Sequence, residues 1–130
     1  MRFQWIALAS IVVLAGCESP SNTRNYSIYF QPYSAELDQQ ARESTETAAL
    51  YARANASLPI SVIGFSAPAD PGRDVDGLSA QRAEAITQAL TAEGVSANRI
   101  SVSSSSAIDP LPMAMVAVRR VDISIGGAAR

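Results

Sequence analysis

Four short runs along the chain have the hydrophobic pattern of β-strands. The run from Ile60 to Phe65 is apolar and rich in β-branched residues, and a loop of small and polar residues follows it, which is typical of a buried strand. Near the C-terminus, Val121, Ile123 and Ile125 alternate with polar residues, which indicates a strand with one buried face. The predicted strands are residues 26–30, 60–65, 100–104 and 119–125.

Two longer stretches have apolar residues at helical spacing. The first begins at Ser34, its predicted N-cap, and continues to about Ala54. The second runs over residues 78–92, with Asp76 as its predicted N-cap and Gly94 as the glycine that ends it. Both helices are long enough to cover a sheet of short strands.

The predicted order of elements is therefore β-α-β-α-β-β. This order favours an α/β (α+β) two-layer sandwich, with one mixed four-stranded sheet and both helices on one face. The run of serines 103–106 overlaps the end of the third strand, and we expect this run to form a solvated loop.

The first sixteen residues have the pattern of a bacterial targeting segment. Arg2 provides a positive charge, and residues 5–14 are apolar but too few to span a membrane. The sequence Leu14-Ala15-Gly16-Cys17 resembles a lipobox, which implies that residues 1–16 are a lipoprotein signal peptide and that Cys17 becomes the lipidated N-terminus. An ordinary secretory signal with an incidental cysteine, or a retained membrane anchor, are the alternatives.

The remainder of the chain divides where its composition changes. Residues 17–25 are predicted to be the lipidated cysteine and a short polar tether, residues 26–125 a single domain, and residues 126–130 a tail. The lipobox resemblance also implies that Glu18 favours the outer membrane. We therefore expect a periplasmic domain that is attached to the outer membrane through lipids on Cys17.

Charge and side-chain chemistry narrow the possible functions. The ten basic residues are all arginine, and against twelve acidic residues they give a formal net charge of −2, which offers no basic field for nucleic acid. The chain has no histidine and one cysteine, so disulfides within the chain, Ser-His-Asp catalysis and Cys/His metal sites are all excluded. With Cys17 acylated, thiol catalysis is excluded too. We expect a protein that is not an enzyme and that needs no cofactor or metal.

Arg82 is the polar residue that stands out in the second predicted helix. At about 100° per residue it projects within about 40° of Leu78, on the apolar stripe, where a charge is costly unless it is paired. One interpretation is a salt bridge within the chain. The other is a guanidinium that binds an anion by forking onto a ligand carboxylate. The candidate partners for the salt bridge are Asp70, Asp74 and Asp76 in the preceding loop.

Three blocks of sequence, in a fixed order and spacing, cover nearly all of the predicted domain. The blocks are Ile28-Tyr29-Phe30 with Ser34-Ala35-Glu36-Leu37; Gly64 with Leu78-Ser79-Ala80-Gln81-Arg82-Ala83; and Gly94-Val95 with Arg99-Ile100-Ser101-Val102, Pro110 and Arg119-Arg120-Val121-Asp122-Ile123. The ordered set resembles the OmpA-like domain family, the peptidoglycan-binding module of outer-membrane proteins, lipoproteins and flagellar stators.

The resemblance implies a ligand and the residues that hold it. The family binds the diaminopimelate of the peptide stem with an Asp in a G-H-T-D block and an Arg in an L-S-x-x-R-A block. Arg82 matches the Arg, but Ala67 stands in the place of the Asp, so Asp70 is the candidate substitute. Ser66 occupies the Thr position and Arg119 belongs to the closing block. The implied ligand-binding residues are therefore Arg82, Asp70, Ser66 and Arg119.

Two functions from different classes follow from the resemblance. The first is an outer-membrane lipoprotein that associates non-covalently with peptidoglycan and tethers the envelope to the cell wall. The second is a divergent periplasmic adaptor that keeps the fold, binds a protein partner and has lost the wall ligand. Arg82 and the complete order of blocks favour the first function, whereas Ala67 and the short tether favour the second.

Overall fold

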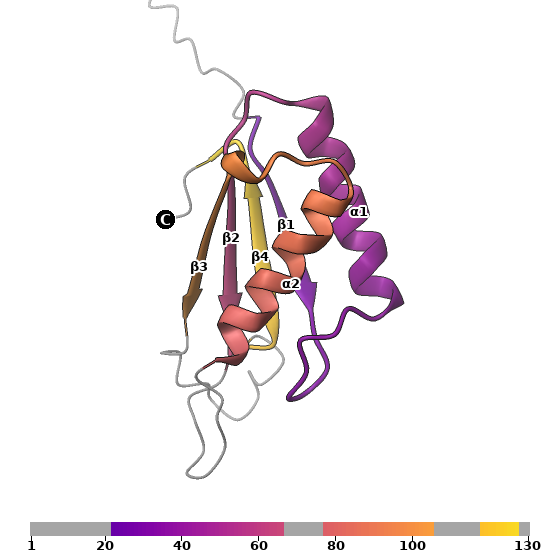
Figure 1. The fold of residues 1–130 in the computed structure, drawn as a ribbon, viewed down its shortest axis with the longest axis vertical. Coiled ribbons are helices and arrows are strands. Elements are labelled where there is room, and N and C mark those ends of the chain that lie inside the picture. The colour runs from indigo at the N-terminus through magenta and orange to yellow at the C-terminus, as the bar shows by residue number, and fades with distance from the viewer. Residues whose placement is uncertain (1–21, 67–76, 106–117, 128–130) are drawn as a thin grey trace, which may run out of the picture.

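The computed structural model describes residues 22–66, 77–105 and 118–127, which form one sheet and two helices (Figure 1). The predicted β-α-β-α-β-β order is confirmed. In chain order the elements are β1 (Arg24–Tyr29), α1 (Gln39–Ala54), β2 (Ile60–Phe65), α2 (Leu78–Ala92), a 3-10 turn η1 (Ala97–Arg99), β3 (Ile100–Ser105) and β4 (Arg120–Ile125).

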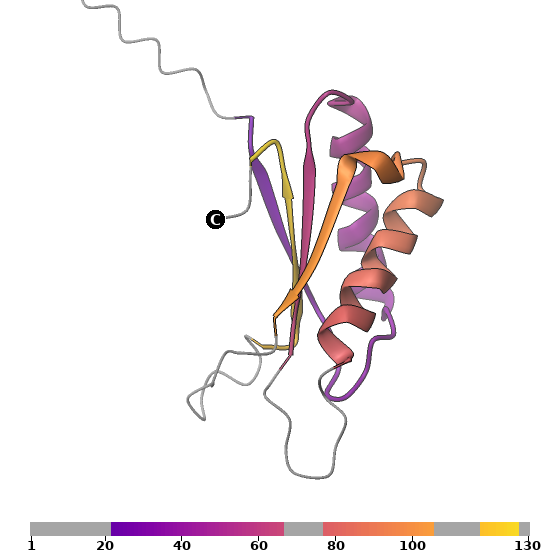
Figure 2. The same ribbon diagram turned by 60° about the vertical axis from the view of Figure 1, so that its left-hand side comes forward.

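The four strands form one mixed sheet in the order β1-β4-β2-β3. β4 is antiparallel to both of its neighbours, whereas β2 and β3 are parallel. Both helices lie on the same face of the sheet, and no described helix covers the other face (Figure 2). The predicted α+β two-layer sandwich, with a mixed sheet and helices on one face, is therefore confirmed.

The hydrophobic core lies between the sheet and the two helices. Alternate residues of β2 and β4 are buried there, and the pairing of Val62 with Ile123 brings the two strands into register. α1 contributes mostly alanines to the core, whereas α2 contributes the larger Ile86 and Leu90. The buried face of each element thus follows the apolar pattern of its sequence.

Gly64 allows α2 to begin directly against the end of β2. A Cβ atom on Gly64 would overlap the main-chain oxygen of Ser79 and would lie 3.0 Å from the Cβ of Ala83. Glycine is therefore required at this position in the strand. The close contact fixes the first turns of α2, from which Arg82 projects.

The N-cap predicted for α1 is wrong. The helix begins at Gln39 and its N-cap is Asp38, whose Oδ1 accepts the main-chain N–H of Ala41 at 2.8 Å. Ser34 instead accepts the main-chain N–H of Glu36 at 3.0 Å, one residue after Tyr33 turns the chain with a φ of 55°. A local side-chain bond of this kind stabilises a turn in competition with a helix.

α2 has its predicted bounds, but its N-cap is Gly77, which makes no side-chain capping bond. Asp76, the predicted cap, lies outside the described residues. The predicted glycine stop is confirmed, because Gly94 has a φ of 89° and the N–H of Val95 donates to the oxygen of Leu90 at 3.1 Å. This is the Schellman arrangement of a helix C-terminus.

The boundaries of three strands differ from the predictions. β1 spans residues 24–29 where 26–30 was predicted, and β4 begins at Arg120 where Arg119 was predicted. The solvated loop predicted for serines 103–106 is wrong for residues 103–105, which continue β3 opposite residues 63–65 of β2. Parallel pairing with a buried neighbour outweighs the sequence preference of serine for loops. Ser106 lies outside the described residues.

Candidate functional site

Several chain segments meet beside the first turns of α2. β1 and β2 both end there and β4 begins there, at the lower end of the sheet in Figure 1. The segment that connects β1 to α1 contacts the same place through the main-chain oxygens of Gln31 and Ser34. Loops gathered at one end of a sheet are a common location for binding sites.

Arg82 joins these segments through main-chain hydrogen bonds. Its side chain is 1% exposed, on the core-facing side of α2 as the apolar stripe predicted. Nε donates to the oxygen of Ser34 at 2.8 Å, and Nη2 donates to the oxygen of Gln31 at 3.2 Å. Nη1 donates to the oxygens of Phe65 at 3.1 Å and Val118 at 3.4 Å. One guanidinium therefore holds the β1–α1 connection, the end of β2 and the segment that leads into β4.

The charge of Arg82 is not neutralised by a carboxylate among the residues that the structure describes. Burial, together with the positive charge of Arg119, lowers the pKa of Arg82 to about 10, so that it stays protonated at neutral pH. The guanidinium lies over the ring of Phe30, 5.4 Å from the centroid, and this contact adds a weak attraction. The salt bridge to Asp70, Asp74 or Asp76 falls outside the described residues, and so that interpretation stays a prediction.

Arg119 has a donor that its surroundings leave unsatisfied. Its Nε is buried and has no hydrogen-bond partner in the described part of the chain. Leaving a charged donor buried without an acceptor costs about 1–3 kcal/mol or more, so such groups need an explanation. Arg119 also borders a cavity of about 320 Å³ between β1 and the first half of α1, whose polar lining includes Gln31, Asp38, Gln40 and Ser44.

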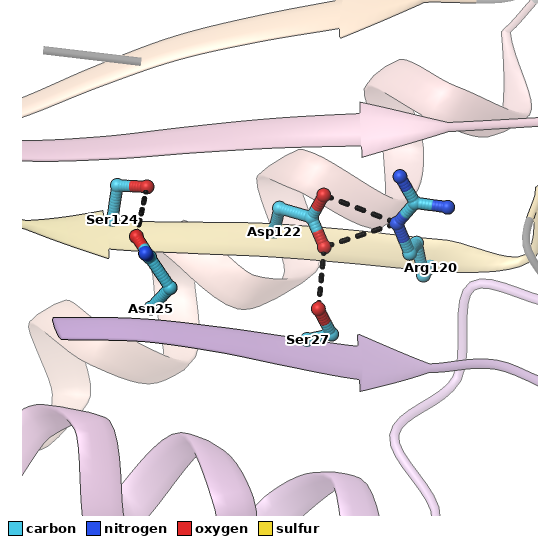
Figure 3. A network of polar contacts seen from close by, with 5 residues as sticks. All are labelled: Asn25, Ser27, Arg120, Asp122 and Ser124. Carbon is cyan, nitrogen blue, oxygen red and sulfur yellow. Dashed lines mark hydrogen bonds and ion pairs between the residues drawn. The ribbon is translucent and has the colours of Figure 1, made fainter. Parts of the chain in front are cut away.

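Arg120, the next residue, is in a different environment on the opposite face of the sheet. Its Nε forms an ion pair with Asp122 at 3.0 Å, and Asp122 also accepts the hydroxyl of Ser27 at 2.8 Å (Figure 3). The guanidinium lies 4.4 Å from the centroid of the Phe65 ring. Strand alternation therefore gives consecutive arginines opposite roles, because Arg120 is paired whereas Arg119 faces the interior beside Arg82.

The remaining predicted site residues are divided between the described and undescribed parts of the chain. Ser66 follows β2 and is 1% exposed, and its main-chain N–H donates to the oxygen of Ser105 at 3.3 Å. The structure thus brings Ser66, Arg82 and Arg119 to one end of the sheet. Asp70 and Cys17 lie outside the described residues, and their roles stay predictions.

Two contributors to this end of the molecule escaped the sequence analysis. The first is the set of main-chain oxygens around Arg82, because peptide groups leave no signature in the amino-acid sequence. The second is the cavity between β1 and α1, with Asp38 at its border. The acidic residue at position 38 was visible in the sequence, and recognising it as the N-cap of α1 would have placed it at this end.

Two structural searches limit the chemistry of the described residues. Within residues 22–66, 77–105 and 118–127, no group of three or more acidic or cysteine side chains could hold a metal ion. Over the same ranges, no helix combines the length and the apolar composition that crossing a membrane requires.

Comparisons with known proteins place the chain in one family. A model described as the OmpA family matches residues 29–121, whereas no curated protein matches. The OmpA-like domain of FopA1 from Francisella tularensis is 18% identical, with a TM-score of 0.67 over 78% of this chain and 71% of that one. A peptidoglycan-associated lipoprotein from Burkholderia pseudomallei is 22% identical, with a TM-score of 0.64, and the match covers 77% of this chain and 89% of that one. The C-terminal domain of Helicobacter pylori MotB is 25% identical, with a TM-score of 0.63, and the match covers 79% of this chain and 85% of that one. The chain is a member of the OmpA family.

Proposed function

We propose that this protein is an outer-membrane lipoprotein whose periplasmic domain binds the peptide stem of peptidoglycan non-covalently. The observation that carries the proposal is the pair of guanidiniums at the loop end of the sheet, the buried Arg82 and the half-buried Arg119. The described residues provide no carboxylate partner for either of them. Peptide stems carry free carboxylates, which are the preferred partners of a guanidinium.

The two arginines would contribute in different ways. Most of the donors of Arg82 are occupied by main-chain oxygens, so its main contribution is positive charge and the positioning of the surrounding loops. The half-buried guanidinium of Arg119 borders a cavity and would contact the ligand carboxylate directly. Ser66 lies at the same end, and Asp70 stays a predicted ligand-binding residue outside the described residues.

Family membership and one named neighbour also support this proposal. The match to the OmpA family covers most of the domain, and one structural neighbour is named as a peptidoglycan-associated lipoprotein. The lipobox at Cys17 supports attachment to a membrane, because several acyl chains make a stable anchor. Together these features describe a link between the outer membrane and the cell wall.

The test is sedimentation of the full-length protein with purified peptidoglycan sacculi in mild detergent. We expect Arg119→Ala to weaken binding by about tenfold or more, since a bond between charged groups contributes about 1.5–3 kcal/mol. Arg120→Ala is the matched control because it removes the same charge from the opposite face, and it should bind like the wild type. Wild-type protein that stays in the supernatant would contradict the proposal and favour the adaptor function.

A further inference from the structure

We propose that Asp38 holds the ammonium group of the ligand, in the cavity between β1 and α1 that Arg119 also borders. This inference rests on the proposed function. It assigns the carboxylate that the ammonium of the ligand needs, because Ala67 stands in the place of the family's Asp. The ligand group that fits is an amino-acid zwitterion, with an ammonium and a carboxylate on one carbon. Arg119 would contact the carboxylate and Asp38 the ammonium.

The cavity brings opposite charges together without pairing them. Asp38 enters from the start of α1 and Arg119 from the residue before β4, and both line the same space of about 320 Å³. Asp38 and Arg119 do not form an ion pair with each other, since the ion pair among the described residues joins Arg120 and Asp122. A volume of this size is at the lower end of the range for small-ligand sites and suits an amino-acid group.

Each charge has unused bonding capacity. The Nε of Arg119 is buried without a partner, and the positive charge of Arg82 nearby increases the need for an anion. On Asp38, Oδ1 is used to cap α1, whereas Oδ2 has a single long contact of 3.4 Å from the amide of Gln31. A carboxylate offers about four acceptor positions, so Oδ2 can still accept bonds from an ammonium.

The position of Asp38 is fixed before any ligand arrives. Its bond to the N–H of Ala41, at 2.8 Å, is the N-cap of a sixteen-residue helix, so the carboxylate does not need to be ordered on binding. Such preorganisation favours affinity because little conformational entropy is lost.

This assignment accounts for the departure at Ala67. A zwitterionic ligand needs a negative partner for its ammonium, and without one the desolvated charge costs affinity. Ala67 offers no charge, whereas Asp38 offers one from a different element of the same end of the sheet. The binding chemistry is then retained although the acidic residue has changed its position in the chain.

The experiment compares Asp38→Asn with Glu43→Gln in the full-length protein. Asparagine caps helices as well as aspartate does, so Asp38→Asn removes the charge and keeps α1. Glu43→Gln removes an equal charge from the exposed surface of α1, where Glu43 accepts the amide of Gln39 at 2.8 Å. Equal melting temperatures of the three proteins confirm that the variants are folded.

The probe is a soluble muropeptide that ends in diaminopimelate, used with a free ammonium and after N-acetylation. We expect wild type and Glu43→Gln to prefer the free ammonium by about tenfold or more, and Asp38→Asn to lose that preference. An Asp38→Asn variant that keeps the preference, or a wild type that shows none or does not bind, overturns the assignment. Sacculus sedimentation in parallel separates the role of Asp38 from peptidoglycan binding itself. If the muropeptide result overturns the role of Asp38 but the wild type still sediments with sacculi, the proposed function stands.

Discussion

Replacement of Arg82 with alanine tests whether its guanidinium holds the loop end of the sheet together. The change removes the donors to four main-chain oxygens, and each bond to a charged group contributes about 1.5–3 kcal/mol. It also removes a buried charge whose pKa burial lowers to about 10, and relief of that desolvation returns about 3 kcal/mol. Water that enters the vacated space will solvate part of the exposed oxygens. We therefore expect a net loss of about 3 kcal/mol in the free energy of unfolding.

The assay is thermal unfolding followed by circular dichroism. In a domain of this size a loss of about 3 kcal/mol lowers Tm by about 15 °C. Arg82→Lys should fall between the wild type and Arg82→Ala, because one ammonium cannot reach oxygens that surround a planar fork. Arg120→Ala, which removes an exposed-face ion pair, should change Tm by only about 2–4 °C.

The result that would refute this reasoning is an Arg82→Ala protein that melts within about 3 °C of the wild type. Such a protein would show that water replaces the guanidinium without cost. If it also failed to bind sacculi, Arg82 would act on the ligand alone. Lost stability with unchanged sacculus binding would instead make Arg82 purely structural.

Four further changes test other parts of the structure. Gly64→Ala should lower stability by about 3 kcal/mol in chemical denaturation, because a Cβ overlaps the main chain of Ser79; wild-type stability would contradict that contact. Arg99→Ala should cost about 2–3 kcal/mol in the same assay, since Arg99 donates to the oxygens of Ala52, Asn55 and Leu58, whereas exposed Arg53→Ala should be nearly neutral. Cys17→Ala should release the protein from membranes or leave it unprocessed in cell fractionation, and membrane attachment that withstands washing would contradict the lipobox. Ala67→Asp should leave sacculus sedimentation nearly unchanged because Asp38 already holds the ammonium, and stronger sedimentation would place the ammonium at the family's acidic position instead.

Hydrophobic periodicity was sufficient to predict the fold. The alternation of Val121, Ile123 and Ile125, and the apolar run before Gly64, depend only on which face of each strand is buried, and burial is what the sequence pattern records. The helix stop at Gly94 was equally visible, because a positive φ favours glycine. The order of these elements and their connections then left few possible topologies.

Competition between local and tertiary interactions explains the errors. Ser34 has the right chemistry for an N-cap, but Asp38, four residues later, has it too, and the sequence does not say which of the two bonds to the helix. Ser103 prefers loops by itself, yet pairing with Ile63 extends β3. Helical periodicity placed Arg82 in the core, but only the structure shows that main-chain oxygens surround it.

The exclusive use of arginine for positive charge has a structural basis in this molecule. Arg82 gathers oxygens from three segments at one end of the sheet, and Arg99 gathers the oxygens of Ala52, Asn55 and Leu58 where α1 ends. A lysine ammonium is a compact point charge without a rigid fork, so it could not satisfy either set in the same directions. Arg119 has the same fork, but no described main-chain oxygen accepts its Nε, and the residue borders a cavity. The difference between the structural role of Arg82 and the role proposed for Arg119 therefore follows from how many main-chain oxygens the fold directs at each guanidinium.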